Sequence, residues 1–214
     1  MKPVKKIFNK YFFTSIILIV FPLSVFAVSN YKFIKLPYGV SLELPKNWLI
    51  LSKTNRITLD SYVHSKNENS GFAYNSSDLN FAANYYDNSG NVAALINVRF
   101  YQDIDISQND AITAESGDIA ELDRLIHDSL IKSGQINNFS IINWLGTKKK
   151  KINNLTAFIS EYERSAINNN GNTKVRLIRV FNNKKSFTLT ISYKKSQEKL
   201  LRPICDHIIL TLHI

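Results

Sequence analysis

Apolar and polar residues alternate with a period of two near residue 40, which is the pattern of a strand that buries one face. Val40 to Leu44 shows this alternation, and residues 31–36 precede it as another short strand. A Pro37-Tyr38-Gly39 turn separates the two. Pro45 ends the second strand, and a new apolar run extends from Trp48 to Leu51. The pattern therefore predicts two short strands followed by a further apolar segment.

A longer hairpin is predicted from Phe81 to Asp103. Its turn is Asp87-Asn88-Ser89-Gly90, a set of small polar residues that tolerate positive φ. The second arm, 92–100, is apolar on both faces at its start, so we expect it near the centre of a sheet that is covered on both sides. The first arm is more polar and is expected nearer an edge. Residues 64–78, which precede the hairpin, are rich in Ser, Asn and Gly and are expected to form a mobile loop.

Two further hairpins are predicted in the last third of the chain. The first pairs 139–145 with 152–164 through a connection that includes Gly146 and the run Lys148 to Lys151. The second pairs 174–181 with 187–193. In the last of these strands alternate residues are apolar, so one face is expected to be buried.

Two amphipathic helices accompany these strands. The first is expected to begin near Asp110 or Thr113 and to end at Ser133-Gly134. Its apolar stripe consists of Ile112, Ile119, Leu122, Ile126 and Leu130. The second is expected from about Gln197, with Pro203 in or near its first turn. Its apolar stripe consists of Leu200, Leu201, Ile204, Ile208 and Leu212.

The order of elements is strands, helix, four antiparallel strands and a second helix. Each amphipathic helix needs a sheet face to cover its apolar stripe. The sequence therefore predicts an α+β fold, a three-layer α/β/α sandwich on a mainly antiparallel sheet. Residues 28–214 suit a single domain of this kind, with no internal repeat and no second boundary.

One segment resembles a known family. Residues Tyr38 to Trp48, YGVSLELPKNW, are similar to the opening strand and Pro-x-x-Trp segment of the PsbP-like superfamily. The late hairpins from Ala157 to Tyr193, followed by a terminal helix, match its closing arrangement. Members include extrinsic photosystem proteins, a Ran-binding nuclear protein and bacterial envelope proteins such as DcrB. The resemblance implies a PsbP-like binding or assembly module without catalysis, and it transfers no ligand residues.

The first 27 residues have the pattern of a secretory signal peptide. Four lysines precede an apolar stretch from Tyr11 to Phe26, and Val25-Phe26-Ala27 suits cleavage near Ala27. The protein is therefore expected in the periplasm or outside the cell. An uncleaved membrane anchor is the alternative, although the stretch holds fewer than the roughly 20 apolar residues of a typical span. No cysteine lies directly after this stretch, which excludes the lipid-modified N-terminus of a bacterial lipoprotein.

Charge and cysteine content narrow the function classes. The formal net charge is +10, but residues 1–27 contribute four lysines and no acid, so the remainder carries +6. This moderate charge, in an exported chain, argues against nucleic acid as a partner. Cys205 is the only cysteine, so no intramolecular disulfide can form. It lies in the apolar pattern of the last helix and is interpreted as a buried structural thiol.

The sequence contains no pattern that predicts catalysis, a cofactor or a metal. Asp123 and His127 share a helix face, but a third metal ligand would have to come from elsewhere. Glu161 and Glu163 lie on one side of a predicted strand and are interpreted as solvent-facing partners of Arg176 or Arg179 in the next strand. We therefore expect a protein that is not an enzyme.

Lysines at the predicted turns form the candidate site for a partner or an anion. These residues are Lys148, Lys149, Lys150, Lys151, Lys184 and Lys185, with Lys194-Lys195 at a later turn. The first hypothesis is an exported, non-enzymatic binding or accessory protein of the bacterial periplasm, which docks on an envelope protein or complex. The alternative is a secreted factor that binds anionic lipid or polymer through a lysine patch. The oligomeric state stays open.

Overall fold

The computed structural model describes residues 30–68, 79–102, 106–165, 171–182 and 185–214. The predicted signal peptide and its cleavage site near Ala27 lie outside the described residues. Within them, no helix is both long and apolar enough to cross a membrane.

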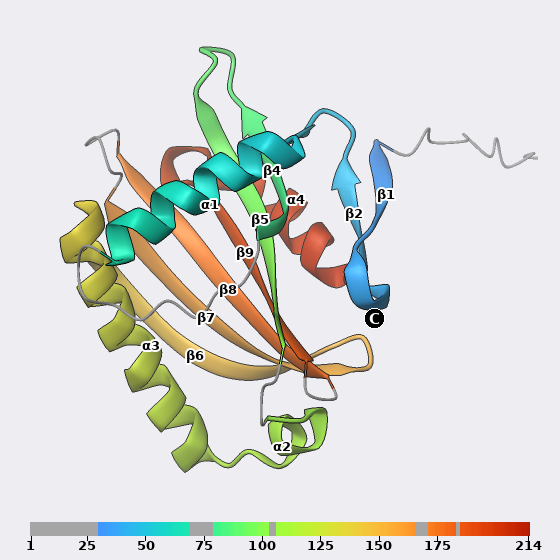
Figure 1. The fold of residues 1–214 in the computed structure, drawn as a ribbon, viewed down its shortest axis with the longest axis vertical. Helices are drawn as coiled ribbons and strands as arrows, with labels where there is room; N and C mark the ends of the chain where they lie inside the picture. The colour runs from blue at the N-terminus through green and yellow to red at the C-terminus, as the bar shows by residue number, and fades with distance from the viewer. Residues whose placement is uncertain (1–29, 69–78, 103–105, 166–170, 183–184) are drawn as a thin grey trace, which may run out of the picture.

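A seven-stranded antiparallel sheet forms the centre of the fold (Figure 1). Its strands, from one edge to the other, are β3 (Leu49–Ile50), β4 (Leu79–Tyr86), β5 (Val92–Gln102), β9 (Lys185–Lys194), β8 (Asn172–Asn182), β7 (Leu155–Ser165) and β6 (Ile141–Ile152). The hairpin predicted from Phe81 to Asp103 is confirmed as β4 and β5. β5 lies inside the sheet as predicted, and β4 has only the two-residue strand β3 outside it.

Both faces of the sheet are covered, which confirms the predicted α/β/α arrangement. Helix α4 (Glu198–Leu210) and a separate hairpin of β1 (Tyr31–Lys35) and β2 (Ser41–Pro45) cover one face. Helices α1 (Lys53–Glu68), α2 (Gln108–Thr113) and α3 (Ser116–Asn137) lie on the other face, where α1 crosses the sheet and α3 follows β6 (Figure 1).

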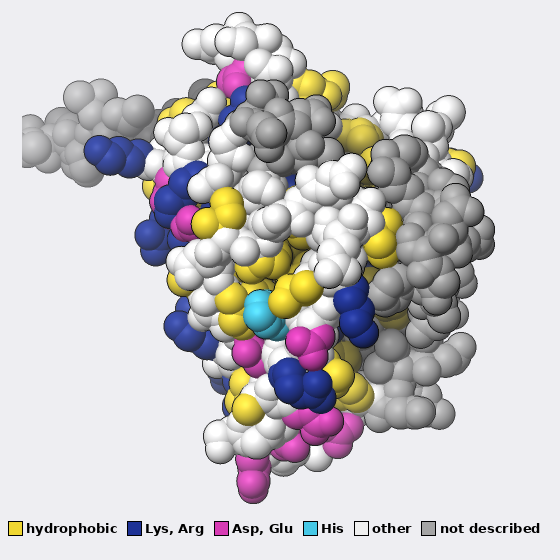
Figure 2. Space-filling view, turned by 90° about the vertical axis from the view of Figure 1, so that its left-hand side faces the viewer, with side chains coloured by type: hydrophobic (Ala, Val, Ile, Leu, Met, Phe, Trp, Pro, Cys, Tyr) yellow, Lys and Arg dark blue, Asp and Glu magenta, His cyan; other side chains and the backbone are white. Residues whose placement is uncertain are grey.

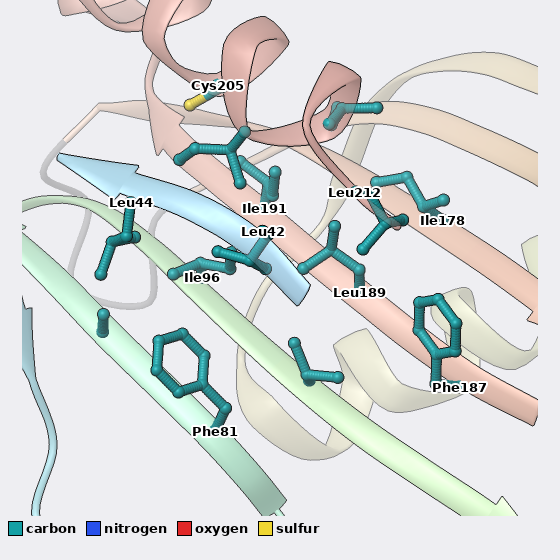
Figure 3. Packing of buried hydrophobic residues seen from close by; sticks show 14 of the residues in the cluster. Leu42, Leu44, Phe81, Ile96, Ile178, Phe187, Leu189, Ile191, Cys205 and Leu212 are labelled. Atoms are coloured by element: carbon teal, nitrogen blue, oxygen red, sulfur yellow. The ribbon is translucent and has the colours of Figure 1, made fainter. Parts of the chain in front are cut away.

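The main core lies between the sheet and the layer of β2 and α4. Figure 3 shows side chains of β2, of the central strands and of α4 meeting there. Those with no exposed surface include Leu42, Leu44, Ile96, Ile178, Leu189, Ile191, Leu201, Cys205, Ile208 and Leu212. The alternation predicted for β9 is confirmed, since Phe187, Leu189, Ile191 and Tyr193 all face this core.

The end of the described chain is fastened to the first hairpin. Ser41 and His213 exchange two backbone hydrogen bonds of 2.8 and 2.9 Å. Two residues away, the Glu43 N–H donates to Thr211 Oγ1 at 3.1 Å. The β1–β2 hairpin therefore belongs to the same layer as α4, although neither strand joins the main sheet.

Two predictions that concern helices need correction. His64 to Glu68, predicted as loop, belong to helix α1, and the rest of 64–78 from residue 69 on lies outside the described residues. The helix predicted from about 110 to 134 is two helices with separate N-caps. Ser107 caps α2 through a reciprocal pair of contacts with Asp110, and the Glu115 N–H donates to Asp118 at the start of α3.

The ends and the buried faces of these helices also differ from the prediction. α3 continues past Gly134 to Asn137, and Asn138 adopts the left-handed conformation that ends it. Ile112 is 55% exposed because the break between α2 and α3 turns it away from the sheet. In α4, Leu200 is 58% exposed and Cys205 takes its place in the buried stripe.

The connection predicted around Lys148 to Lys151 is wrong. β6 runs without interruption through these lysines, and the hairpin turn lies at Asn153-Asn154, where Asn153 has a φ of 51°. Asn accepts this left-handed conformation more readily than most residues. The four lysines are therefore strand residues at the edge of the sheet.

Candidate functional site

Helix α3 and edge strand β6 enclose a groove of about 660 Å³. The helix contributes residues at intervals of about four, which places them on one face. The lining consists of His127, Ile131, Gly134, Gln135, Asn138, Phe139, Ser140, Ile141, Ile142 and Trp144. Figure 2 views the molecule from the α3 and β6 side, where hydrophobic side chains gather in the middle of the surface.

Asp123 fastens α3 to β6 next to this groove, through a hydrogen bond with the lining residue Trp144. Its carboxylate accepts hydrogen bonds from Trp144 Nε1 at 3.1 Å and from the Thr147 N–H at 2.6 Å. The strand register shifts between Trp144 and Gly146, and Gly146 has a φ of 84°. This bulge turns the edge of β6 toward the helix. The carboxylate therefore satisfies an edge N–H that a neighbouring strand would otherwise bind.

An aromatic stack continues from the groove into the protein. The rings of His127 and Trp144 lie 4.9 Å apart, and those of Trp144 and Tyr162 lie 5.9 Å apart. Burial raises the pKa of Tyr162 to about 12, so its phenol stays protonated. The stack fixes Trp144 between two rings and makes the floor of the groove rigid.

The pair Asp123 and His127, weighed above as two metal ligands, lies here on one helix face. The hydrogen bonds to Trp144 and Thr147 occupy the Asp123 carboxylate. No group of three or more His, Cys, Asp or Glu side chains suited to a metal occurs in the described parts of the chain. The pair therefore has a structural explanation in the attachment of α3.

The strand pleat divides the predicted lysine site between two faces. Lys148 and Lys150 pair with Ile159 and Ala157 of β7, which belong to the core under α4. Lys149 pairs with Phe158, which faces α2. Lys149 Nζ donates to the carbonyls of Ile112 and Ala114 at 3.0 and 2.6 Å. Lys149 therefore holds the junction of α2 and α3.

The remaining predicted lysines differ in their surroundings. Lys148, Lys150 and Lys151 are exposed, and none forms an ion pair with a residue that the structure describes. Lys184 lies outside the described residues, and Lys185 begins β9 with a side chain outside them. Only part of the predicted set is thus brought together, along the edge of β6.

Glu161 and Glu163 are held in ion pairs. Glu161 contacts Arg176 Nε at 2.9 Å, as the cross-strand pairing predicted, and Glu163 contacts Lys195 at 2.6 Å. Both side chains lie on the α4 face and are partly buried, which corrects the expectation that they face solvent. Arg176 also binds Asp206 of α4. These pairs connect the sheet to its helical layer.

Cys205 is fully buried, as predicted, and burial raises the pKa of its thiol to about 12. The thiol therefore stays protonated and unreactive at neutral pH.

The groove itself was not predicted, although two features of the sequence point to it. Ile131 and Gln135 continue the spacing of His127 along α3, on a side of the helix outside the predicted apolar stripe. The predicted strand after Phe139 also contains two successive isoleucines, one of which must face away from the core.

Comparisons with known proteins identify the fold of the chain but do not assign it to a sequence family. No family model matches the chain, and no curated protein does. The chain is similar to the solution structure of cyanobacterial PsbP (CyanoP) from Synechocystis sp. PCC 6803, with a TM-score of 0.55 at 8% identity. This match covers 91% of this chain and 98% of that one.

Two further solved structures are similar at lower scores. One is LpqN, described as involved in cell envelope biogenesis of Mycobacterium tuberculosis, with a TM-score of 0.45, 10% identity, and coverage of 85% of this chain and 88% of that one. The other is the Ran-binding protein Mog1p of Saccharomyces cerevisiae, with a TM-score of 0.44, 9% identity, and coverage of 86% and 95%. The match to CyanoP confirms the PsbP-like fold that the sequence resemblance implied.

Proposed function

We propose that this chain is an exported, non-catalytic binding protein of the bacterial envelope, which docks on an envelope protein through the α3–β6 groove. One observation carries the proposal. Ile131 and Ile142 line the groove and are 42% and 50% exposed. Apolar side chains that share a hollow with aromatic groups are typical of docking surfaces.

The proposal that the protein is not an enzyme rests on the carboxylates and the thiol that could act as catalytic bases or nucleophiles. The Asp123 carboxylate is occupied by two hydrogen bonds, and Glu161 and Glu163 are held by cations. The Cys205 thiol is buried and protonated. Each of these groups has a structural task, so none is left as an activated nucleophile or base.

The partner's chemistry follows from the two halves of β6. The first half carries Ile142 at the groove, and the second half presents exposed Lys148, Lys150 and Lys151. A partner that fills the groove with apolar side chains and extends around the edge of β6 would meet these lysines with carboxylates. Export is supported by the signal-peptide pattern of residues 1–27.

Site-specific photo-crosslinking tests the docking surface. A photoreactive amino acid is placed at Ile142 in the tagged full-length protein in living cells, with a matched position at exposed Leu200 of α4 on the opposite layer. We expect one discrete adduct from position 142, lost when Ile131→Asp is added, and none from position 200. Equal adducts from both positions, or none from position 142, would contradict the docking proposal.

Cell fractionation tests the location separately. We expect the protein in the periplasm or the medium, with a mature N-terminus near Val28. A protein found in the cytoplasm with residues 1–27 intact would contradict export.

A second candidate function is binding to anionic lipid or polymer through the β6 lysines. The observation in its favour is that Lys148, Lys150 and Lys151 have no carboxylate partner among the described residues. Each lysine near an anionic surface is worth about 1 kcal/mol. Binding to phosphatidylglycerol vesicles that is lost at high salt and in the triple alanine variant would support it. Binding unaffected by the triple change would end it.

A further inference from the structure

The two faces of the central strands differ in chemistry. On the α4 side, β8, β9 and β5 present Ile178, Leu189 and Ile96, all completely buried. Toward α1, the same strands present the polar residues Arg179, Thr188, Thr190, Asn97 and Arg99, with Leu95 and Leu177 beside them. A sheet face under helices is ordinarily apolar. This polar inner face therefore calls for an explanation.

Helix α1 covers this face through polar contacts. Asp60 forms an ion pair with Arg99 of β5 at 2.6 Å and accepts a hydrogen bond from the Leu79 N–H of β4 at 3.2 Å. Ile57 and Leu59 of the same helix are 55% and 42% exposed. No residue of α1 whose side chain the structure describes is buried. The side chains of α1 that the structure describes therefore form no apolar core with the sheet beneath them.

Arg179 is the exceptional residue of the inner face. It occupies one row across three strands with Thr188 and Arg99. Arg99 has Asp60, and Arg176 on the other face has two carboxylates. Arg179 has no ion pair or hydrogen bond to any residue that the structure describes, although burial lowers the pKa of its guanidinium. A partly buried cation with five N–H donors normally has an anionic or carbonyl acceptor.

Two neighbours of Arg179 on this sheet face, Phe158 and Phe181, line a largely apolar cavity, although Arg179 itself is not part of its wall. It has a volume of about 410 Å³ between α2, the start of α3 and the sheet, and Ala111, Ala114, Leu122, Phe158 and Phe181 contribute to its wall. Phe158 pairs directly with Arg179 across β7 and β8. Phe181 follows two positions later on the same face of β8. The cavity size is in the range of small-molecule sites.

Two carboxylates also line this cavity, and both are engaged in helix capping. Asp110 accepts from the N–H and the hydroxyl of Ser107, each at 2.7 Å. Asp118 accepts from the Glu115 N–H at 2.8 Å. Their negative charge disfavours an anion at the helical end of the cavity. An anionic group is therefore favoured toward the sheet side of the cavity, where Phe158 is the cross-strand partner of Arg179.

We propose that this cavity and Arg179 form a binding site for an anionic amphiphile. The apolar chain of the ligand occupies the space between Phe158 and Phe181, and its carboxylate binds the Arg179 guanidinium. A guanidinium presents two parallel N–H donors to a carboxylate, which makes the pair short and directional. This site lies on the α1–α3 side of the sheet, apart from the docking groove, and goes beyond the proposed function.

The test uses calorimetry on the folded full-length protein with dodecanoate below its micellar concentration. Dodecanol has the same chain without the charge, and acetate has the same charge without the chain. A charged hydrogen-bonded contact is worth about 1.5–3 kcal/mol, or about 10- to 150-fold in Kd. We expect dodecanoate to bind at least about tenfold more tightly than dodecanol, and acetate not to bind.

Two variants and a control locate the site. Arg179→Met is expected to abolish the preference for dodecanoate over dodecanol, whereas Arg124→Met, an exposed arginine on α3, is expected to leave it unchanged. Ala114→Leu reduces the cavity and is expected to weaken both long-chain ligands alike. The proposal is overturned if dodecanoate and dodecanol bind equally, if neither binds, or if both arginine variants lose the preference to the same extent.

Discussion

Replacing Asp123 by alanine is expected to cost about 2–4 kcal/mol of unfolding free energy. The change removes the acceptor of two hydrogen bonds, from Trp144 Nε1 at 3.1 Å and from the Thr147 N–H at 2.6 Å. A net contribution of about 1.5–3 kcal/mol applies to each hydrogen bond with a charged partner. Because both bonds share one carboxylate, the two contributions do not add fully. Asp123→Asn keeps an acceptor oxygen, so a smaller loss is expected.

Urea denaturation followed by tryptophan fluorescence measures this loss. The matched control is Asp128→Ala on the same helix, where the exposed pair with Arg124 at 3.2 Å is worth at most about 1 kcal/mol. A cycle with Trp144→Phe separates the indole bond, and a coupling of about 1–2 kcal/mol between positions 123 and 144 is expected. A loss below about 0.5 kcal/mol for Asp123→Ala, at an unchanged m-value, would refute the assignment of Asp123 as the attachment of α3 to β6.

Three further changes test other parts of the fold. Gln108→Ala is expected to cost about 1–3 kcal/mol and to accelerate amide exchange at the end of β7, because the side chain bridges the backbones of β7 and β8. Contacts with Lys195 and then Lys174 lower the pKa of Glu198 to about 2, so its stabilising contribution is present above about pH 4.5 and is lost as the pH falls toward 2. Glu198→Gln is expected to flatten the dependence of Tm on pH in this window. Gly134→Ala is expected to lower the unfolding free energy by about 1–3 kcal/mol, because the new Cβ would lie 2.5 Å from the Phe139 carbonyl oxygen. Gly117→Ala meets open space and is expected to raise the unfolding free energy by up to about 1 kcal/mol. Urea denaturation measures both changes.

Each of these expectations has a contrary result. Unchanged amide exchange in Gln108→Ala would show that the backbone hydrogen bonds between β7 and β8 are stable near Thr156 without the Gln108 side chain. If Tm depends on pH in the same way in the wild type and in Glu198→Gln, the ion pairs of Glu198 do not contribute to the loss of stability in acid. Equal effects of the two glycine substitutions would show that the close approach of Gly134 to Phe139 is not a constraint.

The period-two patterns predicted most of the sheet because its central strands bury one face in the core under α4. β9 is the best case, with Phe187, Leu189 and Ile191 in the core. The path of β6 was missed because four successive lysines do not alternate in polarity, and an edge strand does not require such alternation. Lysine is common on edge strands, so this run is consistent with its position.

Helix α1 was missed for a related reason. Two of its apolar residues, Ile57 and Leu59, are exposed, and Asp60 contacts the sheet through Arg99 and the Leu79 N–H. A search for an apolar stripe cannot find a helix that is attached by polar side chains. The candidate site escaped prediction because its residues come from α3 and β6, which are joined by the hydrogen bonds of Asp123 near the bulge before Gly146.

The fastening of β2 to the segment after α4 determines when this domain can fold. Glu43 and Thr211 are 168 residues apart, and Leu42 and Leu44 are covered only when α4 is present. Contacts of such long separation slow folding, because a large loop must close before they form. A chain emerging from the ribosome, or threading through a membrane pore, therefore keeps this layer open until His213 has appeared. A fragment cut before α4 would expose the leucines of β2 and is expected to aggregate.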